Sequence, residues 1–559
     1  RGELQTPWTE GMNFRNLEDN GFIKFDFLGL TLLKDVENCI RRILTRQNDK
    51  EPTFLEIRDW FDKHLNCRYV EQDDDAVWKH VYHQRRKVGV FQFTAEGARR
   101  FCEDAKPTAI IELAALTAIY RPGPLRANVH LKYVKDKARA DEIVYAHPII
   151  KEILGPTFGH VTFQEQFMLL AQKLGGFTPA ESDKLRKTLV KKSLDTMGKK
   201  GGEREAARQK FVSGAKEIND VPEHVSQELW ERIEFFSVYG FNKSHAVAYA
   251  IGSYYAAWLH TYYETDWLST ILESENNNPK NLSKAISEIK AMGYEISTHD
   301  VNESGLSWNY SERKKAFIPP LNSFKGLGKN AVQEIMKNRP YQSLDQMLYN
   351  EEGKWYHSKL NKTGFAALCK VEALDALEEM WQSEIKNHRQ LHEIIIQNYD
   401  ILKKSRFGMT LRQAKKKEAD PILPMLIEST SDTEDWTRVE KLQMYQDMCS
   451  ATRDDLAFPD DLMDKIKSSH VKSVLQFKAH EKGIGWFCVV EWIKKTTKNK
   501  KIFYRVKITD DESNTGWLRI WGEIPNAMQP YTIWLTETKN DPNWGCSTSS
   551  RKIRPLVVS

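Results

Sequence analysis

The spacing of hydrophobic residues changes near residue 468, and this change constrains the fold class. Upstream, segments such as residues 31–48 repeat apolar residues every three or four positions, as an amphipathic helix requires. Downstream, FCVVEWIKK, KIFYRVKITD and GWLRIWG are aromatic and β-branched runs separated by turns, typical of a small β-barrel. The sequence therefore predicts a multidomain α+β protein with a large mainly helical region, a small helical module and a C-terminal β-barrel.

The length and composition are those of a globular protein. The chain has 559 residues, of which 40% are hydrophobic and 28% charged, and at about 100–200 residues per domain this predicts about three to five domains. It contains neither an apolar run long enough to span a membrane nor a signal-peptide pattern. Its seven cysteines form no CxxC or Cys/His cluster, which indicates a reducing compartment. We therefore expect a cytoplasmic protein.

Basic residues gather in three stretches, at residues 184–192, 403–417 and 494–501. The net charge of +5 is small for this length, and each stretch alone is typical of a solvated face or loop. Because tryptophans and tyrosines lie nearby, the three stretches together favour a polyanionic partner.

Glycine and proline interrupt the helical region in two places. RPGPL (121–125) breaks any helix and predicts a rigid turn. The charged GKKGGERE (198–205) predicts a mobile loop.

The strand-like stretch IKFDFLGL (23–30) carries a carboxylate within an apolar run. Side chains alternate along a strand, so Lys24 and Asp26 share one face and the phenylalanines share the other. A carboxylate is unfavourable in an apolar interior unless a cation meets it. Three interpretations stay open at this point: an exposed polar face, an ion pair between Lys24 and a neighbour, or a metal-binding carboxylate.

Two further stretches have features of nucleic-acid contacts. In FKGLGKNA, Gly326 and Gly328 flank Leu327 at the start of a helix, where open backbone amides can bind phosphate as in a helix–hairpin–helix module. The alternative is an ordinary helix start. The predicted barrel combines many aromatics with the basic loop 494–501, as single-stranded nucleic acid requires, although about half of these aromatics must fill the barrel core.

The segment YGFNKSHAVAYA (239–250) crowds polar groups at a predicted helix start. Asn242, Lys243, Ser244 and His245 together suit an anion or a polar ligand docking against that helix. Helix capping is the alternative for Asn242 and Ser244. Capping does not explain the lysine and the histidine beside them.

Seven motifs occur in an order that resembles one protein family. They are KFDFLGL (24–30), GVFQF (89–93), RPGPL (121–125), FGHVTFQEQFM (158–168), SDKLRKTLVKK (182–192), YGFNKSHAVAYA (239–250) and FKGLG (324–328). In this order they resemble the C-terminal portion of the C-family replicative DNA polymerases, the bacterial DNA polymerase III alpha subunits. The downstream barrel resembles the OB-like domain of the DnaE-type branch.

The resemblance implies a domain order. It comprises the last strand of a nucleotidyltransferase-like palm at 1–34, mainly helical fingers at 35–295, a helix–hairpin–helix and clamp-binding-like region at 296–390, a helical connector at 391–465 and an OB-like domain at 466–559.

The resemblance also implies chemistry for the first motif. Asp26 is similar to one of three carboxylates that hold two Mg²⁺ ions during in-line transfer of deoxynucleotides to a primer 3′-hydroxyl. Lys24, on the same strand face, is placed to touch primer or phosphate charge. The family's other two carboxylates lie in an upstream P-D-x-D motif, which residues 1–21 do not contain. We therefore expect the two ions to be shared with carboxylates outside this chain.

Further residues inherit expected roles from the resemblance. The nucleotide-binding set is Arg186, Lys187, Lys191, Lys192, Asn242, Lys243, Ser244 and His245, and the DNA-binding set is Arg121, Lys325, Gly326, Gly328, Lys329, Lys498 and Lys500. Lys187 stands where the family usually has a second arginine, so the bidentate phosphate grip is lost there. A bulky His245 is expected to help exclude a ribose 2′-hydroxyl.

The expected function is part of a DNA-directed DNA polymerase, inactive as this chain alone. The chain begins with Arg1, and we expect a fragment or a split-gene product that needs an upstream palm, thumb and PHP segment. Expected partners are primer–template DNA, dNTPs, a 3′–5′ exonuclease, a sliding clamp and other replisome subunits in a bacterial or phage-infected cell. QMYQDM (443–448) is a poor match to a clamp-binding peptide. The alternative function is a non-catalytic DNA-binding or scaffolding protein derived from such a polymerase.

Overall fold

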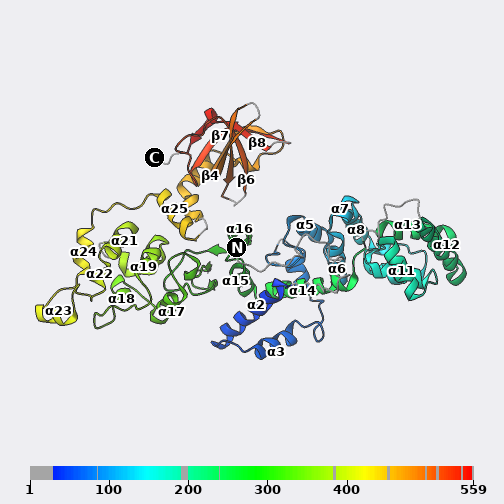
Figure 1. Cartoon of the computed structure of the whole chain (residues 1–559), viewed down its shortest axis with the longest axis horizontal. Coiled ribbons are helices and arrows are strands. Elements are labelled where there is room, and N and C mark those ends of the chain that lie inside the picture. Colours follow the sequence, from blue (N-terminus) through cyan, green and yellow to red (C-terminus); the bar gives the residue numbers. More distant parts are fainter. Residues whose placement is uncertain are drawn as a thin grey trace, which may run out of the picture. The chain divides into compact units, whose positions relative to one another are not determined.

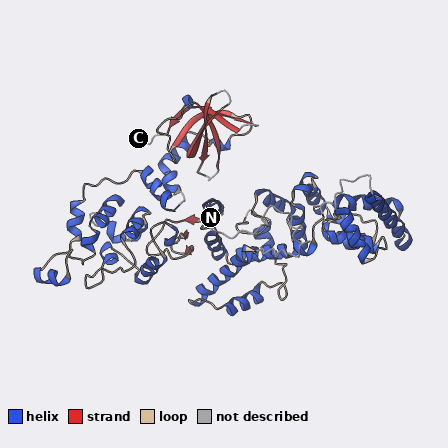
Figure 2. Ribbon diagram, in the orientation of Figure 1, coloured by secondary structure: helices blue, strands red, loops and turns tan. Residues whose placement is uncertain are grey.

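The computed structural model describes residues 29–84, 86–190, 199–237, 240–381, 385–449, 453–497, 500–511, 515–542 and 545–556. The chain forms two compact units, Arg1–Tyr262 and Tyr263–Ser559. Helices fill the described part of the first unit, whereas the second combines helices, a small sheet and a barrel (Figure 2). Among the described residues, no helix is both long and apolar enough to cross a membrane.

The first unit is helical throughout its described length (Figure 1). Its helices are α2 (Thr31–Asn48), α3 (Phe54–His64), α4 (Asp75–Val77), α5 (Glu96–Ala105), α6 (Ile110–Ile119), α7 (Pro122–Arg126), α8 (Val129–Lys137), α9 (Pro148–Leu154), α10 (Gln164–Lys173), α11 (Pro179–Val190), α12 (Lys199–Asn219), α13 (Glu223–Ser237) and α14 (Lys243–Tyr262). A π-helical turn, Trp78–Tyr82, follows α4.

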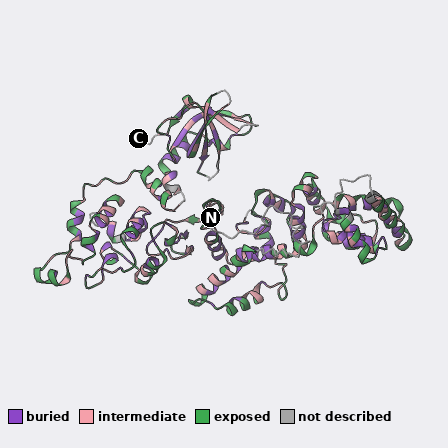
Figure 3. Ribbon diagram, viewed as in Figure 1, coloured by how far each residue is buried: buried purple, intermediate pink, exposed green. Residues whose placement is uncertain are grey.

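Helix α14 lies at the centre of the first core because its small residues permit close packing. Ala246, Ala250 and Ala257 are buried against a cluster that includes α5, α6 and α8. A Cβ added to Gly252 would lie 2.8 Å from the side chain of Leu32 on α2. Small side chains therefore bring α2 and α6 against α14, and Figure 3 shows the buried residues along these helices.

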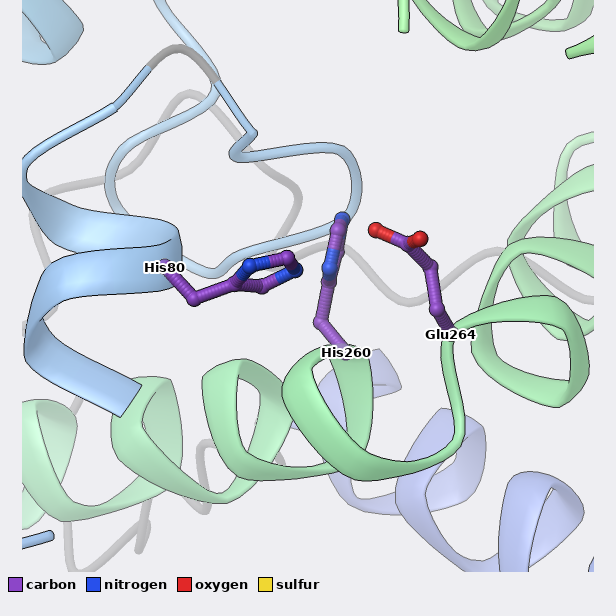
Figure 4. Close-up of side chains that lie close together, drawn as sticks. All are labelled: His80, His260 and Glu264. Carbon is purple, nitrogen blue, oxygen red and sulfur yellow. The ribbon is translucent and has the colours of Figure 1, made fainter. Parts of the chain in front are cut away.

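The C-terminal half of α14 packs against the π-helical turn. Tyr82 and Ser253 are buried, with hydroxyl oxygens 3.0 Å apart. Further along, the rings of His80 and buried His260 lie 6.1 Å apart (Figure 4). Glu264, also labelled there, begins α15 and accepts a hydrogen bond from Tyr294 within the second unit. Nothing in the hydrophobic pattern singled out this histidine pair.

A second core of the first unit is formed by α9 to α13. Its buried residues include Phe167, Leu185, Phe211 and Trp230, and the rings of Phe211 and Trp230 lie 5.5 Å apart. The predicted mobile loop at 198–205 is wrong, because α12 already begins at Lys199. Helix-forming residues continue without a break into the buried part of this helix, and this continuity outweighs the local glycines.

The RPGPL segment does end a helix, as predicted. Helix α6 stops at Ile119, and Arg121 adopts an extended conformation. However, Pro122 then occupies the first position of the short helix α7. A residue at this position has no intrahelical partner for its N–H, so proline loses no hydrogen bond there. The segment is therefore a helix–helix junction and not only a turn.

The second unit opens with helices and a three-stranded sheet. The helices are α15 (Glu264–Ser274), α16 (Pro279–Ala291), α17 (Lys329–Asn338), α18 (Leu344–Leu348), α19 (Lys362–Lys370), α20 (Glu378–Trp381), α21 (His388–Gln397), α22 (Tyr399–Leu402), α23 (Leu411–Lys417), α24 (Leu423–Ser429), α25 (Arg438–Cys449), α26 (Asp454–Ala457) and α27 (Asp460–Ser468). In the sheet, β3 (Ala316–Ile318) lies between parallel β1 (Glu295–Ile296) and antiparallel β2 (Asn309–Ser311).

One hydrophobic core joins most helices of the second unit. It runs from Val301 to Tyr445 and includes Leu327, Leu368 and Ile394. Helices α21 to α25, in the stretch that the resemblance gave as a helical connector, therefore pack with α17 to α19.

The C-terminal strands close into the predicted β-barrel. They are β4 (Lys482–Thr496), β5 (Ile502–Thr509), β6 (Thr515–Trp521), β7 (Ile533–Asp541), β8 (Gly545–Ser549) and β9 (Ile553–Pro555). Five strands run β4-β5-β6-β8-β7 and return to β4, while β9 pairs with β7. β6 and β8 are parallel. A bulge between Val489 and Glu491 bends β4, so that one long strand pairs with both β5 and β7.

Candidate functional site

Segments far apart in the sequence meet at the start of α14. The N–H of Gln164 donates to the carbonyl of Phe241 at 2.9 Å, and the N–H of Phe241 donates to the carbonyl of Thr162 at 3.2 Å. The side-chain amide of Gln164 also donates to the carbonyl of Gly240, at 3.1 Å. The FGHVTFQEQFM and YGFNKSHAVAYA motifs are therefore joined by backbone pairing.

Buried Gln166 holds the first of these segments in shape. Its Oε1 accepts hydrogen bonds from the N–H groups of Thr162 and Phe163, at 2.9 and 3.0 Å. Its Nε2 donates to the carbonyl of Ile153 and the hydroxyl of Thr157, at 3.1 and 2.7 Å. All of its polar atoms are satisfied, so the side chain fixes the loop that meets α14.

Capping groups organise the first turn of α14. Asn242 Oδ1 accepts hydrogen bonds from the N–H of His245 at 2.8 Å and from the Ser244 hydroxyl at 2.7 Å. Glu165 Oε2 accepts the N–H of Lys243 at 2.9 Å. Asn242 thus caps the helix, as the capping alternative stated, while the side chains of Lys243 and His245 are exposed.

Aromatic rings form a row beside this helix start. The Arg121 guanidinium lies 4.6 Å from the centroid of the Phe241 ring. The ring centroid of Phe241 lies 5.4 Å from that of His245, which lies 4.2 Å from that of Tyr249. The Tyr249 centroid in turn lies 5.0 Å from that of Phe91. GVFQF, RPGPL and YGFNKSHAVAYA therefore contribute to one surface. A cation, ring faces and a helix N-terminus together can hold an anion that carries a planar ring.

Arg121 is held in place from its own loop. Its Nε donates to the carbonyl of Ala118 at 2.8 Å, and burial lowers the pKa of its guanidinium. Phe241 was not among the predicted site residues. The only sequence signal for it was its position inside the YGFNKSH motif.

The basic helix α11 lies in the other core of this unit. Asp183 pairs with Lys187 at 2.7 Å and with Arg186 at 2.9 Å, and hydrogen bonds from Lys187 and Arg186 lower the pKa of the carboxyl. Among the described residues, no hydrogen bond or ion pair joins these two cations to the start of α14. A phosphate that used them would replace Asp183 as their partner.

Several predicted residues lie outside the described part of the chain. They are Lys24, Asp26, Lys191, Lys192 and Lys498. Lys500 is described and exposed in the loop between β4 and β5.

The FKGLG segment forms one side of a surface hollow of about 340 Å³. Gly326 has a left-handed backbone (φ 102°), Leu327 points into the core with 5% of its surface exposed, and Gly328 caps α17. The other side is the start of α19, which Asn361 caps, together with Lys359. Two helix N-termini therefore face one hollow, an arrangement suited to phosphate.

Lys359 was missed by sequence reasoning. The signal was present, because HSKLNKTG places a buried leucine, Leu360, just before a helix, as FKGLGKNA does with Leu327. Lys325 and Lys329, which were predicted, are exposed beside the glycines.

Glu334 on α17 holds the loop that carries Lys359. Its carboxylate accepts hydrogen bonds from the N–H groups of Ser358, Lys359 and Leu360, at 2.7, 2.9 and 3.0 Å. Burial opposes ionisation, but these hydrogen bonds outweigh it and lower the pKa of Glu334 to about 2. The ionised carboxylate therefore ties the two halves of the hollow together.

We expect Glu334→Gln to loosen residues 358–360. At neutral pH the loss of charge-assisted hydrogen bonds costs about 1–3 kcal/mol, so amide hydrogen exchange of this loop should speed up. Because the folded pKa is depressed, the stabilisation is complete above the unfolded value of about 4.3 and disappears as pH falls through about 2. The difference in exchange between parent and variant should shrink over the same range. Glu351→Gln, at an exposed position on the same module, is the matched control, and equal exchange in all three proteins at pH 7 would contradict this role.

The outer face of β5 and β6 carries a ladder of rings and cations. Phe503 pairs across the strands with Trp521, Arg505 with Arg519, and Lys507 with Trp517. The Arg505 guanidinium lies 4.5 Å from the Trp517 ring, and that of Arg519 lies 5.5 Å from Phe503.

The barrel aromatics divide between core and surface. Trp517 and Trp521 are 40% and 37% exposed, whereas Trp486, Phe487 and Tyr504 are buried. This confirms that a share of the aromatics fills the core. It also identifies the outward-facing rings, which composition alone did not distinguish.

Comparison with known proteins defines the class to which these features correspond. Residues 38–219 match the family described as "Bacterial DNA polymerase III alpha subunit finger domain", and residues 293–383 match "Helix-hairpin-helix motif". The chain is homologous to bacterial DNA polymerase III alpha over its finger and helix–hairpin–helix region.

Individual relatives are DNA polymerase III alpha subunits of several bacteria. The chain is 31% identical to that of Aquifex aeolicus over 67% of this chain and 30% of that protein. The identity to the Borreliella burgdorferi protein is 32% over 71% of this chain and 32% of that protein. The identity to the Xylella fastidiosa protein is 28% over 78% of this chain and 34% of that protein. The chain thus spans about a third of the length of these curated relatives.

Proposed function

We propose that this chain forms the finger, helix–hairpin–helix and barrel portion of a template-directed DNA polymerase. The convergence of four motifs at the start of α14 carries the proposal. There Phe91 contacts Tyr249, Arg121 lies over Phe241 and Gln164 donates to Gly240. These contacts lie beside the helix start that exposes the side chains of Lys243 and His245. This surface would receive the incoming dNTP, with Lys243 toward its phosphates.

His245 would stand beside the sugar of that nucleotide. Its exposed ring contacts those of Phe241 and Tyr249, at centroid distances of 5.4 and 4.2 Å. A ring held by these contacts would clash with a ribose 2′-hydroxyl more than with a deoxyribose. Unchanged discrimination against ribonucleotides in a His245→Ala variant would exclude this role.

The chemical step would use Asp26 and two Mg²⁺ ions, with further carboxylates from outside this chain. When bound, the metal would lower the pKa of the primer 3′-hydroxyl and neutralise the leaving pyrophosphate. Asp26 and Lys24 lie outside the described residues, so their geometry adds no support. Arg186, Lys187, Lys191 and Lys192 would bind phosphates of the nucleotide.

The second unit would hold the DNA. The hollow at Gly326, Gly328, Lys329 and Lys359 suits the phosphates of a duplex. The barrel has the strand order of an OB-fold, with parallel β6 and β8, and its aromatic face suits single-stranded template. Arg121, Lys325, Lys498 and Lys500 complete the proposed DNA contacts.

The remaining partners follow from the proposed polymerase. They are primer–template, dNTPs, an upstream palm, thumb and PHP segment, a 3′–5′ exonuclease and other replisome subunits, in a cytoplasmic setting. Clamp binding through residues 443–448 finds no support, because Tyr445 is buried and the segment lies within α25. A clamp-binding peptide would have to expose its anchors.

Supplying the upstream segment of a related alpha subunit as a separate polypeptide tests the proposal. We expect primer extension that requires both polypeptides and is abolished by Asp26→Asn, whereas Asp49→Asn, at an exposed helix end, leaves it intact. Primer–template binding without extension, with Asp26 intact and the two polypeptides associated, would instead indicate a non-catalytic DNA-binding protein.

A further inference from the structure

Six exposed cations lie on the segment of the second unit that runs from the end of α22 through α23, outside the residues that line the hollow and the barrel face. This basic surface consists of Lys403, Lys404, Arg412, Lys415, Lys416 and Lys417. Two lie in the turn that follows α22, one lies in the first turn of α23 and three lie in its last turn. Figure 1 shows α23 as a short helix at one end of this group of helices.

Acidic partners for the basic surface are absent from the described part of the chain. Within the described ranges, none of the six side chains makes an ion pair or a hydrogen bond to a carboxylate. Neighbouring Arg406 differs, because it pairs with Asp345 at 2.7 Å and lies over the Tyr349 ring. Arg406, which the fold neutralises, is therefore not part of the surface.

The fold fixes this surface to the helix–hairpin–helix core. The N–H of Arg406 donates to the carbonyl of Gly353 at 2.9 Å, and the N–H of Ile422 donates to the carbonyl of Arg406 at 3.0 Å. Thr410 and Gln413 form a reciprocal capping box at the start of α23. Buried Leu402 and Leu423, on either side, belong to the same core as α17 and α19.

Solvated lysines near a helix end are the simpler explanation, and they account for only part of the arrangement. Cations in the last turn gain from the helix dipole, which applies to Lys415, Lys416 and Lys417. Lys403 and Lys404 follow the C-terminus of α22, where the dipole also favours cations, whereas Arg412 lies in the first turn of α23, where the dipole disfavours a cation. The dipoles do not explain why six cations gather on a fixed scaffold without acidic partners among the described residues, and such a cluster attracts a polyanion.

We infer that the basic surface binds the phosphate backbone of duplex DNA, as a second contact beside the helix–hairpin–helix hollow. The inference rests on the proposed function, since it requires a chain that binds DNA. Phosphates fit better than bases, because the described residues of this surface offer no exposed aromatic ring and Phe407 is half-buried. The barrel, in contrast, exposes Trp517 and Trp521. The surface therefore adds contacts to the phosphates of a duplex and makes no sequence-specific contact with its bases.

Neutralising the surface in the full chain tests this assignment. The variant Lys415→Gln/Lys416→Gln/Lys417→Gln is compared with a control, Lys280→Gln/Lys465→Gln/Lys467→Gln, that removes three exposed helical lysines elsewhere in the same unit. Binding of a fluorescent duplex of about two helical turns is measured by anisotropy at several salt concentrations. Circular dichroism checks that both variants stay folded.

We expect the test variant to bind duplex about 10-fold or more weakly at about 0.15 M salt, with a slope of log K against log salt reduced by up to about 0.9 per lost contact. The effect should be equal for two unrelated sequences, and the control should match the parent. If the parent binds duplex and the test variant matches it, the inference is wrong while the proposed function stands. If the parent binds no duplex, both are wrong. Loss of binding to polyglutamate without loss of duplex binding would assign the surface to an acidic protein and overturn the inference.

Discussion

Gly214→Ala is expected to destabilise the first unit, although alanine is the better helix former. A Cβ at Gly214 on α12 would lie 2.3 Å from the carbonyl oxygen of Gly175 and 2.7 Å from its carbonyl carbon. Backbone cannot rotate away as a side chain can, so α12 must shift from the end of α10. Overpacking of this kind costs about 1–3 kcal/mol or more, which exceeds the gain of about 1 kcal/mol in helix propensity.

The same helix contains its own control. A Cβ at Gly202 would meet no atom within 4 Å, so Gly202→Ala should stabilise α12 by about 0.5–1 kcal/mol. Hydrogen exchange of α12 peptides and calorimetric melting should move in opposite directions for the two variants. Identical shifts would mean that α12 and Gly175 are not in close contact.

Replacing both Trp517 and Trp521 by alanine should weaken binding of single-stranded DNA by at least about 10-fold. Stacking of a base on an aromatic ring contributes about 1–3 kcal/mol, and both rings are exposed next to guanidinium groups. Titration of an oligothymidine followed by anisotropy measures the effect. Duplex affinity should change much less, because phosphate contacts dominate it.

Two further variants separate stacking from lost folding. Ile484→Ala truncates a side chain that is 61% exposed on β4 of the same barrel, and it should bind single strands as the parent does. Trp517→Phe/Trp521→Phe should recover most of the affinity, since phenylalanine keeps a stacking face. Unchanged binding by the double alanine variant would remove this face of the barrel from the proposed DNA path.

The barrel was predictable because its signal is local. The alternation of apolar and polar residues along β5 and β6 can be seen in neighbouring residues, because odd and even positions of a strand point to opposite faces. Which set faces outward depends on closure of the sheet. Tyr504 is buried and Arg505 exposed only because β4 and β6 flank β5 in one particular register.

The finger surface was less predictable because its contacts join distant segments. The side chain of Gln164 donates a hydrogen bond to Gly240, which is 76 positions away in the sequence. Patterns among neighbouring residues cannot predict such a pairing. The motifs identified the residues through their resemblance to a family. Nothing in their spacing placed Arg121 over Phe241 or Phe91 beside Tyr249.

The small helical module falls between these cases. The glycines of FKGLG predicted a tight turn at a helix start, and their left-handed and capping conformations follow from local sterics. The partner loop at Lys359 and its attachment to Glu334 depend on packing between α17 and α19, which no local pattern encodes.

Local pattern was thus sufficient for the helical and barrel segments, for the turn at Gly326 and for the order of motifs that relates this chain to its family. Packing decided which residues share a surface: the row from Arg121 to Phe91, the two-sided hollow and the exposed rings of the barrel. The physical reason is the sequence separation over which each interaction acts. Backbone sterics and side-chain periodicity act over a few residues, whereas burial and hydrogen bonding reward contacts between segments of any separation.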